Sequence, residues 1–250
     1  MRWLTILTLL IVCCTLFAQS TKQSVSQMFQ VHYGANLPAG DLAKRYGFLS
    51  HIGGGMLLRT PKNFTFSLES SLLFGNQFKS EFDSVFSHLT DSQGNITDIN
   101  GDIAVVMTYA RGFYANACLG KYIPLSAKKK ASHLHLQVGA GYLQHRFRIE
   151  TNSQVIPQIE TNYRKGYDRY TTGINTSQFI GYAFLPEEGF YQFFAGFYAQ
   201  QGYTYNRRTI NFDQPDVPVS ADLRLDLQFG IRLGWYIPFY KAEPRDYYFE

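Results

Sequence analysis

The sequence predicts an all-β protein: an eight-stranded, antiparallel, up-and-down transmembrane β-barrel with short periplasmic turns and long extracellular loops. Three observations predict it. The last strand-like segment alternates strictly between two faces, seven earlier segments do the same, and the connections between them alternate between short and long. A strand can lie in lipid only if every backbone group is paired, and a closed barrel achieves this because it has no edges.

The segment from Asp222 to Phe239 carries the clearest pattern. Every odd position from Leu223 onward is apolar, whereas the even positions hold charged residues, an amide, glycines, Tyr236 and Pro238. A period of two places the apolar residues on one face of an extended strand. The segment is longer than the roughly 9–11 residues that a tilted strand needs to cross a bilayer. It therefore predicts a membrane-spanning strand.

Seven earlier segments repeat this alternation. In the first of them, Phe29, Val31 and Tyr33 share one face, while His32 and Asn36 lie on the other. The approximate ranges of the seven are 28–36, 50–59, 64–75, 102–123, 133–149, 170–185 and 190–206. With the C-terminal segment they make an even number of strands, as an up-and-down outer-membrane barrel requires.

The connections alternate in length. The short ones lie around Pro61, at 124–132 and at 186–189, and the long ones cover 37–49, 76–101, 150–169 and 207–221. Short turns of outer-membrane barrels lie in the periplasm, which places both chain ends there. Prolines at the ends of the four descending strands, where no backbone donor is needed, coincide with clustered aromatic residues typical of a membrane interface. A soluble β-sandwich would not readily combine these two features.

The N-terminus has the form of a cleaved signal peptide. Arg2 precedes an apolar stretch, Leu4–Phe17, that is shorter than the about 20 residues of a spanning helix. An uncleaved anchor is the alternative. We predict a signal peptide at residues 1–18, an N-terminal periplasmic segment at 19–27, the barrel at 28–240 and a C-terminal periplasmic tail at 241–250. The predicted location is the outer membrane of a Gram-negative cell.

Cysteine count and charge exclude two further classes. Removal of residues 1–18 would leave Cys118 as the single cysteine, which excludes a scaffold held together by internal disulfides. The formal net charge of +4 is too small to indicate nucleic-acid binding.

We expect the lumen to be filled with side chains, because eight strands leave an interior just wide enough for them. The predicted lumen-facing residues are His32, Asn36, Glu69, Tyr114, Asn116, Gln137, Asn175, Gln192, Gln200, Asp226, Gln228 and Arg232. Among them we expect a polar cluster of Glu69, Asp226, Arg232, Gln228 and His32, with the first three as a buried ion-pair group. This cluster could form a narrow polar conduit through the barrel. We favour the alternative that it is a structural plug in which the buried polar groups satisfy one another.

We expect neither a catalytic nor a metal site, and no cofactor, so the protein is predicted not to be an enzyme. His145 lies near the outer end of its strand, but Phe147 rather than a serine follows two residues later. His133 and His135 share one face of a strand, yet no third metal ligand is in view. Nucleophile, base and orienting group do not meet at a plausible spacing.

Two surfaces remain for binding. Arg111, Arg146 and Arg148 lie near the outer ends of strands, where they could contact lipid A phosphates. The long second and third loops, with residues such as Tyr163 and Tyr167, could offer an external binding surface.

The residues Arg232, Gly234, Ile237 and Phe239 resemble the terminal assembly signal of outer-membrane barrels, which runs polar, any, glycine, two of any, hydrophobic, any, aromatic. The resemblance implies that the barrel-assembly machinery reads this segment, although residues 240–250 follow it in this chain.

As a whole the chain resembles small eight-stranded outer-membrane barrels of the OmpA, OmpX and PorT type, in a style similar to barrels of Bacteroidota. The resemblance implies a non-enzymatic structural or interaction role, for example as an accessory subunit of an envelope machine such as type IX protein secretion. The implied partners are outer-membrane lipid and lipopolysaccharide, and other envelope proteins. An outer-leaflet lipid A-modifying enzyme and a small channel are the alternatives.

Overall fold

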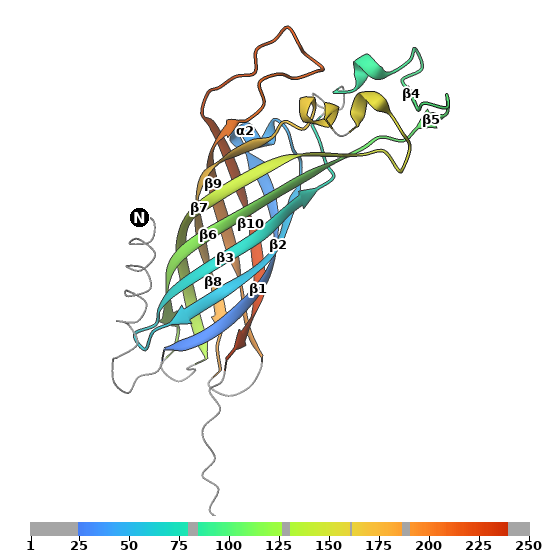
Figure 1. Ribbon diagram of the computed structural model, residues 1–250. Coiled ribbons are helices and arrows are strands. Elements are labelled where there is room, and N and C mark those ends of the chain that lie inside the picture. Colours follow the sequence, from blue (N-terminus) through green and yellow to red (C-terminus); the bar gives the residue numbers. More distant parts are fainter. Residues whose placement is uncertain (1–24, 80–84, 127–130, 161, 187–190, 240–250) are drawn as a thin grey trace, which may run out of the picture.

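The computed structural model describes residues 25–79, 85–126, 131–160, 162–186 and 191–239. Within these ranges, eight long antiparallel strands close into a barrel in the order β1, β10, β9, β8, β7, β6, β3, β2 (Figure 1). Their bounds are β1 Ser26–Ala39, β2 Leu49–Arg59, β3 Phe64–Gly75, β6 Met107–Pro124, β7 Ser132–Glu150, β8 Thr171–Phe184, β9 Gln192–Asn206 and β10 Arg224–Pro238. Each long strand pairs with the next one along the chain, and β1 closes the ring on β10. The predicted fold class is confirmed.

The alternation in the sequence decides which side chains enter the barrel. In β10, Phe229, Ile231 and Leu233 are 47%, 54% and 53% exposed on the outer wall, whereas Gln228 and Arg232 are buried inside. The strands β1 and β3 alternate in the same way. A polar interior behind an apolar exterior inverts the arrangement of a water-soluble protein.

The strands are long enough to cross a bilayer. β1 contains 14 residues. At about 3.3 Å per residue and a tilt of about 45°, a strand of this length rises roughly 33 Å, against a hydrocarbon core of about 30 Å. No helix in the described part of the chain is long and apolar enough to span a membrane.

The long connections gather at one end of the barrel, the top in Figure 1, and the short turns lie at the other. Parts of three long connections pack together into what we call the loop cap, the described residues of 85–106, 151–170 and 207–223. It contains the 3₁₀ helices Ser87–Leu89, Pro157–Ile159 and Tyr163–Gly166 and the small hairpin of β4 (Ile96–Thr97) and β5 (Ile103–Ala104). Its apolar core consists of Val85, Ile96, Ala104, Ile156, Ile159 and Tyr167, together with Ile149 at the end of β7. The loop cap is therefore a packed unit with a core separate from that of the barrel.

One predicted strand boundary is wrong. The fourth strand was expected to begin near Asp102, but β6 begins at Met107 because Ile103 and Ala104 pair with β4 instead. The turn of that hairpin is held by Asp98, whose Oδ1 accepts hydrogen bonds from two backbone amides. The short helix α2 (Gly40–Ala43) was also not foreseen. The predicted signal peptide and the predicted tail at 241–250 lie outside the described residues.

Candidate functional site

An ion pair and its ring of partners fill the barrel at mid-height. Nη1 of Arg232 lies 3.0 Å from Oε1 and 3.2 Å from Oε2 of Glu69, across the lumen. Nη2 of Arg232 donates to the hydroxyl of Tyr114 at 3.0 Å, and the guanidinium lies 3.7 Å from the ring centre of Tyr198. Gln30 donates to Glu69 at 3.1 Å. All five residues are at most 4% exposed, so this layer closes the lumen and compensates its own charge.

An uncharged layer lies next to it, toward the loop cap. Gln228 donates to Gln200 at 3.2 Å and accepts from Asn36 at 3.2 Å. His32 is hydrogen-bonded through Nε2 to Ser71 at 2.7 Å. These hydrogen bonds join amide, hydroxyl and imidazole groups across the lumen, although Nδ1 of His32 and Oδ1 of Asn36 have no hydrogen-bond partner.

A second charged layer lies at the mouth of the barrel, below the loop cap. Asp226 accepts a hydrogen bond from Thr204 and pairs with Nε2 of His145 at 2.9 Å. Arg224 approaches the other carboxylate oxygen at 3.3 Å. Nδ1 of His145 lies 3.2 Å from the hydroxyl of Tyr46. The His145 ring is therefore fixed from both sides.

The expected lumen cluster is thus divided among three layers. The structure places Glu69, Asp226, Arg232, Gln228 and His32 inside the barrel, but it does not bring Asp226 to the other two charges. The expected three-member ion-pair group is wrong in this respect. Asp226 precedes Arg232 by six positions on β10, so Glu69 and Asp226 lie at different heights, and Glu69 pairs with Arg232 whereas Asp226 pairs with Arg224.

Aromatic rings close the lumen near the short turns. The ring centres of Tyr122 and His135 are 4.4 Å apart, and those of Phe194 and Tyr236 are 4.7 Å apart. Phe179 packs edge-on against Phe194. The polar atoms of this layer are the hydroxyls of Tyr122 and Tyr236 and the ring nitrogens of His135, and the Tyr236 hydroxyl lies 3.3 Å from Nδ1 of His135.

The side chains of His133, His135 and His145, the three histidines considered as catalytic candidates, do not point outward from the barrel wall. His135 and His145 are each 1% exposed inside the barrel and contact Tyr236 and Asp226. His133 is buried at the short-turn end, where Nδ1 lies 3.2 Å from a backbone carbonyl. Within the described ranges, no three His, Cys, Asp or Glu side chains gather as a metal site requires.

The chain segment after β1 folds across the mouth of the barrel. α2 and the residues after it place Tyr46 inward with no exposed surface. Arg45 reaches the opposite wall, with Nη1 2.7 Å from Thr171 Oγ1 and Nη2 2.8 Å from Asn206 Oδ1. Burial lowers the pKa of Arg45 to about 10, so it keeps its charge at neutral pH. We call this segment, residues 40–48, the mouth plug.

Sequence reasoning missed Arg45 and Tyr46, because both lie in a connection whose path across the barrel has no sequence signal. His145 could have been found. It is in phase with Gln137, which the alternation assigned to the lumen, and the same alternation continues to His145.

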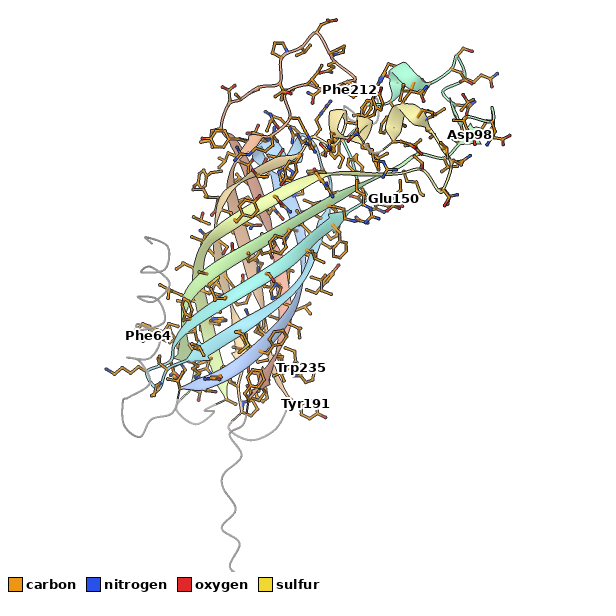
Figure 2. The ribbon with its side chains drawn as sticks, in the orientation of Figure 1. Phe64, Asp98, Glu150, Tyr191, Phe212 and Trp235 are labelled. Carbon is orange, nitrogen blue, oxygen red and sulfur yellow. The ribbon has the colours of Figure 1, made fainter. Side chains whose placement is uncertain are left out.

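Two of the outward arginines are neighbours on adjacent strands. Arg111 of β6 and Arg146 of β7 lie directly opposite each other in the register. The Arg111 guanidinium lies 4.9 Å from the ring centre of Tyr109. Arg148 instead pairs with Glu150 at 2.8 Å. Figure 2 shows Glu150 where β7 leaves the barrel wall for the loop cap, so all of these residues lie near the loop-bearing end.

A hollow of about 460 Å³ opens on the loop cap. It is lined by His88, Leu89, Pro157, Gln158, Tyr163, Tyr167, Phe212 and Pro215. Phe212 (labelled in Figure 2) lies between Tyr163 and Tyr167, with ring centres 6.0 Å and 5.6 Å away. His88 stacks on Tyr167 at 5.6 Å. We call this the aromatic hollow.

Three residues of the expected assembly signal lie on the closing strand β10, and the fourth, Phe239, follows directly after it. Arg232 points inward, whereas Phe239 is 54% exposed and Ile237 is partly exposed. A Cβ atom added to Gly234 would lie 2.4 Å from the carbonyl oxygen of Val31. Glycine at this position therefore permits the close approach of β10 to β1 at the seam of the barrel.

No protein family model matches the sequence, and no curated protein matches it. Among solved structures, Neisserial surface protein A is similar over 88% of this chain and 100% of its own, with 11% identity and a TM-score of 0.43. Ail, the attachment invasion locus protein of Yersinia pestis, solved with the heparin analogue sucrose octasulfate, is similar over 86% of this chain and 99% of its own (9% identity, TM-score 0.41). The N-terminal β-barrel domain of Pseudomonas aeruginosa OprF is similar over 86% and 100% (9% identity, TM-score 0.36). By its own strand order, closure and inverted polarity, the chain is a small eight-stranded β-barrel of the outer-membrane type.

Proposed function

We propose that the protein is an integral outer-membrane barrel with a non-enzymatic interaction role, in which the loop cap faces the cell exterior and binds a partner protein of the envelope. The observation that carries this proposal is the packed loop cap with its aromatic hollow, mounted on a barrel whose lumen is filled. The cap has its own apolar core and therefore presents a defined surface.

The outer wall supports the membrane location. Exposed apolar residues such as Ile52, Leu72, Val138, Ile180 and Phe197 form a band around the barrel. So large an apolar surface would cause aggregation in water, whereas lipid covers it.

Aromatic residues border this band at both ends. Tyr191 and Trp235, labelled at the lower end in Figure 2, are in contact with ring centres 6.0 Å apart. Tyr142, Tyr203 and Tyr205 are exposed nearer the loop cap. Such rings favour the two membrane–water interfaces. With the short turns in the periplasm, the loop cap lies outside the cell.

The filled lumen argues against the channel alternative. An ion passing through would have to displace the Glu69–Arg232 layer, the aromatic layer and the mouth plug in turn. The enzyme alternative has less support, because His135 and His145 are turned inward and held by other side chains. Binding through the loops is the activity that the arrangement favours.

The chemistry of the aromatic hollow fits a protein partner. Tyrosine and phenylalanine rings bury large areas and contribute much of the energy of interfaces, and tyrosine is enriched among the residues that carry most of the binding energy. A subunit of an envelope machine, such as the type IX secretion apparatus, is one partner of this kind. We further propose that the barrel-assembly machinery recognises β10 through Gly234, Ile237 and Phe239 during insertion.

In-cell photocrosslinking tests the interaction role. A photoreactive amino acid at Gln158, inside the aromatic hollow, should give one discrete adduct with an envelope protein. The matched control is Gln93, an exposed glutamine of the same loop cap outside the hollow, which should give none. Loss of the Gln158 adduct on Phe212→Ser would tie it to the hollow. Equal crosslinking at both positions, or a barrel that is always recovered alone, would overturn the proposal.

A further inference from the structure

The outer wall next to the loop cap carries a hollow of about 310 Å³ that the proposed interaction at the loop cap does not use. It is lined by Leu72, Arg111, Gly112, Phe113, Gln144, His145, Arg146, Tyr170 and Arg208. Three of these nine residues are arginines on a wall whose exposed residues are mostly apolar, so the site needs an explanation of its own. We call it the arginine hollow.

Two of its charges, those of Arg111 and Arg146, have no carboxylate partner among the residues that the structure describes. Arg111 and Arg146 are register partners across β6 and β7 on the outward face. Like charges directly opposite each other destabilise a sheet. The nearby acids are occupied, because Glu150 pairs with Arg148 and Asp168 is held by two nitrogens of Arg208. The hollow therefore has an uncompensated positive charge.

The donors of the hollow are already oriented. The guanidinium of Arg208 lies 5.3 Å from the ring centre of Tyr170, and its two bonds to Asp168 hold it there. Tyr170 and Tyr142 both donate to the side-chain oxygen of Gln144, at 2.9 Å and 3.2 Å. This leaves the amide nitrogen of Gln144 as a further donor. Held donors around a positive hollow are what an anion with several oxygens requires.

The place of the hollow identifies the source of the anion. Its lower lining is apolar, with Leu72 and Phe113 on the lipid side. Along β6 the next outward residues are Ala115 and Ala117, which line a second hollow of about 630 Å³ on the same wall. A ligand with a phosphate head and acyl chains has its polar and apolar parts in this order.

We propose that the arginine hollow binds the phosphate of a phosphorylated glycolipid of the outer leaflet, of the lipid A class, between Arg111 and Arg146, with Arg208 and Gln144 at its rim. The inference rests on the proposed membrane location of the barrel and goes beyond the proposed partner at the loop cap. It also refines the sequence-based expectation: Arg208 takes the place of Arg148, because Arg208 lines the hollow and Arg148 does not.

The test uses native mass spectrometry of the full chain, released from non-ionic detergent in the instrument. It compares lipid binding by the unmodified protein and by two variants. Diphosphoryl lipid A should bind the unmodified protein at least ten times more tightly than the double variant Arg111→Gln/Arg146→Gln. The matched control Arg148→Gln should stay within about twofold of the unmodified protein. Lipid A from which the phosphates have been removed should not distinguish the three proteins. Equal binding of diphosphoryl lipid A by all three would overturn the proposal.

A second measurement separates ligand binding from a structural role. Without lipid, the double variant should unfold at the same or a higher temperature than the unmodified protein, because a like-charge contact is removed. With diphosphoryl lipid A the order should reverse. An unchanged order in both conditions would also overturn the proposal.

Two further measurements distinguish a lipid headgroup from free phosphate, and distinguish failure of the proposed membrane location from failure of the proposed lipid site. Inorganic phosphate should compete only weakly, and full displacement at low millimolar concentration would assign the hollow to a free anion and overturn the lipid assignment. Insertion of the unmodified protein into vesicles is measured separately. Failure to insert would count against the membrane location, whereas insertion without phosphate-dependent binding would count against the arginine hollow alone.

Discussion

Removal of the charge of Glu69 should destabilise the barrel strongly, because Glu69 is the only carboxylate in contact with the buried Arg232 among the described residues. The substitution Glu69→Gln keeps the shape of the side chain and replaces one acceptor oxygen by a donor group. Arg232 is only 2% exposed. Its charge would then be buried without a counter-ion.

The size of the effect follows from the contacts. Breaking a buried ion pair by removing one partner costs about 3–5 kcal/mol. Arg232 would keep the Tyr114 hydroxyl at 3.0 Å and the Tyr198 ring at 3.7 Å, and a desolvated cation–π contact is worth about 2 kcal/mol. We therefore expect the lower end of the range, about 3 kcal/mol, which corresponds to roughly a hundredfold change in the unfolding equilibrium.

Urea unfolding of the barrel refolded into lipid vesicles measures this change. Trp235 lies on the outer wall, 37% exposed, and its fluorescence reports on contact with lipid. The matched control is Glu150→Gln, the same substitution in the exposed Arg148–Glu150 pair, where the loss should stay below about 1 kcal/mol.

The double variant Glu69→Gln/Arg232→Met decides whether the reasoning is correct. It removes both charges and leaves an apolar side chain of similar length, so most of the lost stability should return. A double variant as unstable as Glu69→Gln alone, or a single variant within about 1 kcal/mol of the unmodified protein, would refute the account of the lumen as a charge-compensated plug.

Three further predictions concern other parts of the fold. Cys118 faces the lumen and is 2% exposed, so a bulky maleimide should modify it only after unfolding, as seen by a gel shift; labelling of the folded barrel would contradict this. A Cβ atom at Gly34 would lie 2.1 Å from Cε1 of His51, so Gly34→Ala should cost about 1–3 kcal/mol in the urea assay, and a loss below 0.5 kcal/mol (about the assay error) would show that the ring moves freely. The hydrogen bond from Lys44 lowers the pKa of Asp41, the mouth-plug residue that also accepts from the backbone of β10. The stabilisation that Asp41 contributes should be complete above about pH 4 and lost as the pH falls through the lowered pKa. Proteolysis of the mouth plug should therefore increase at these low pH values. The substitution Asp41→Asn should remove this pH dependence of proteolysis.

The face of each long strand was predictable from residue type alone. The alternation in β10 is uninterrupted, and a one-residue slip would have placed Asp226 and Arg232 in lipid and Leu233 in the lumen. The cost of such a slip makes the pattern a reliable guide to inside and outside. The boundary at β6 was less predictable, because Ile103 and Ala104 fit a strand whether they continue the barrel or form a separate hairpin.

The partners inside the lumen were not predictable from the same pattern. Alternation assigns Glu69, Asp226 and Arg232 to the interior but says nothing of their heights. Which residues meet across the lumen depends on the stagger of neighbouring strands around the ring, a property of barrel closure. The structure therefore pairs Arg232 with Glu69 and leaves Asp226 to His145.

The loops show the same division on a larger scale. Local chemistry along the chain determines that a segment such as 150–169 is a connection, that Asp98 begins a turn and that Arg146 lies outside the barrel. Long-range packing determines that the loop cap has a core, that Arg45 crosses the mouth and that Arg208 comes beside Arg146. Alternation acts between neighbours along one strand, whereas these contacts join residues far apart in the sequence whose proximity exists only after the ring has closed.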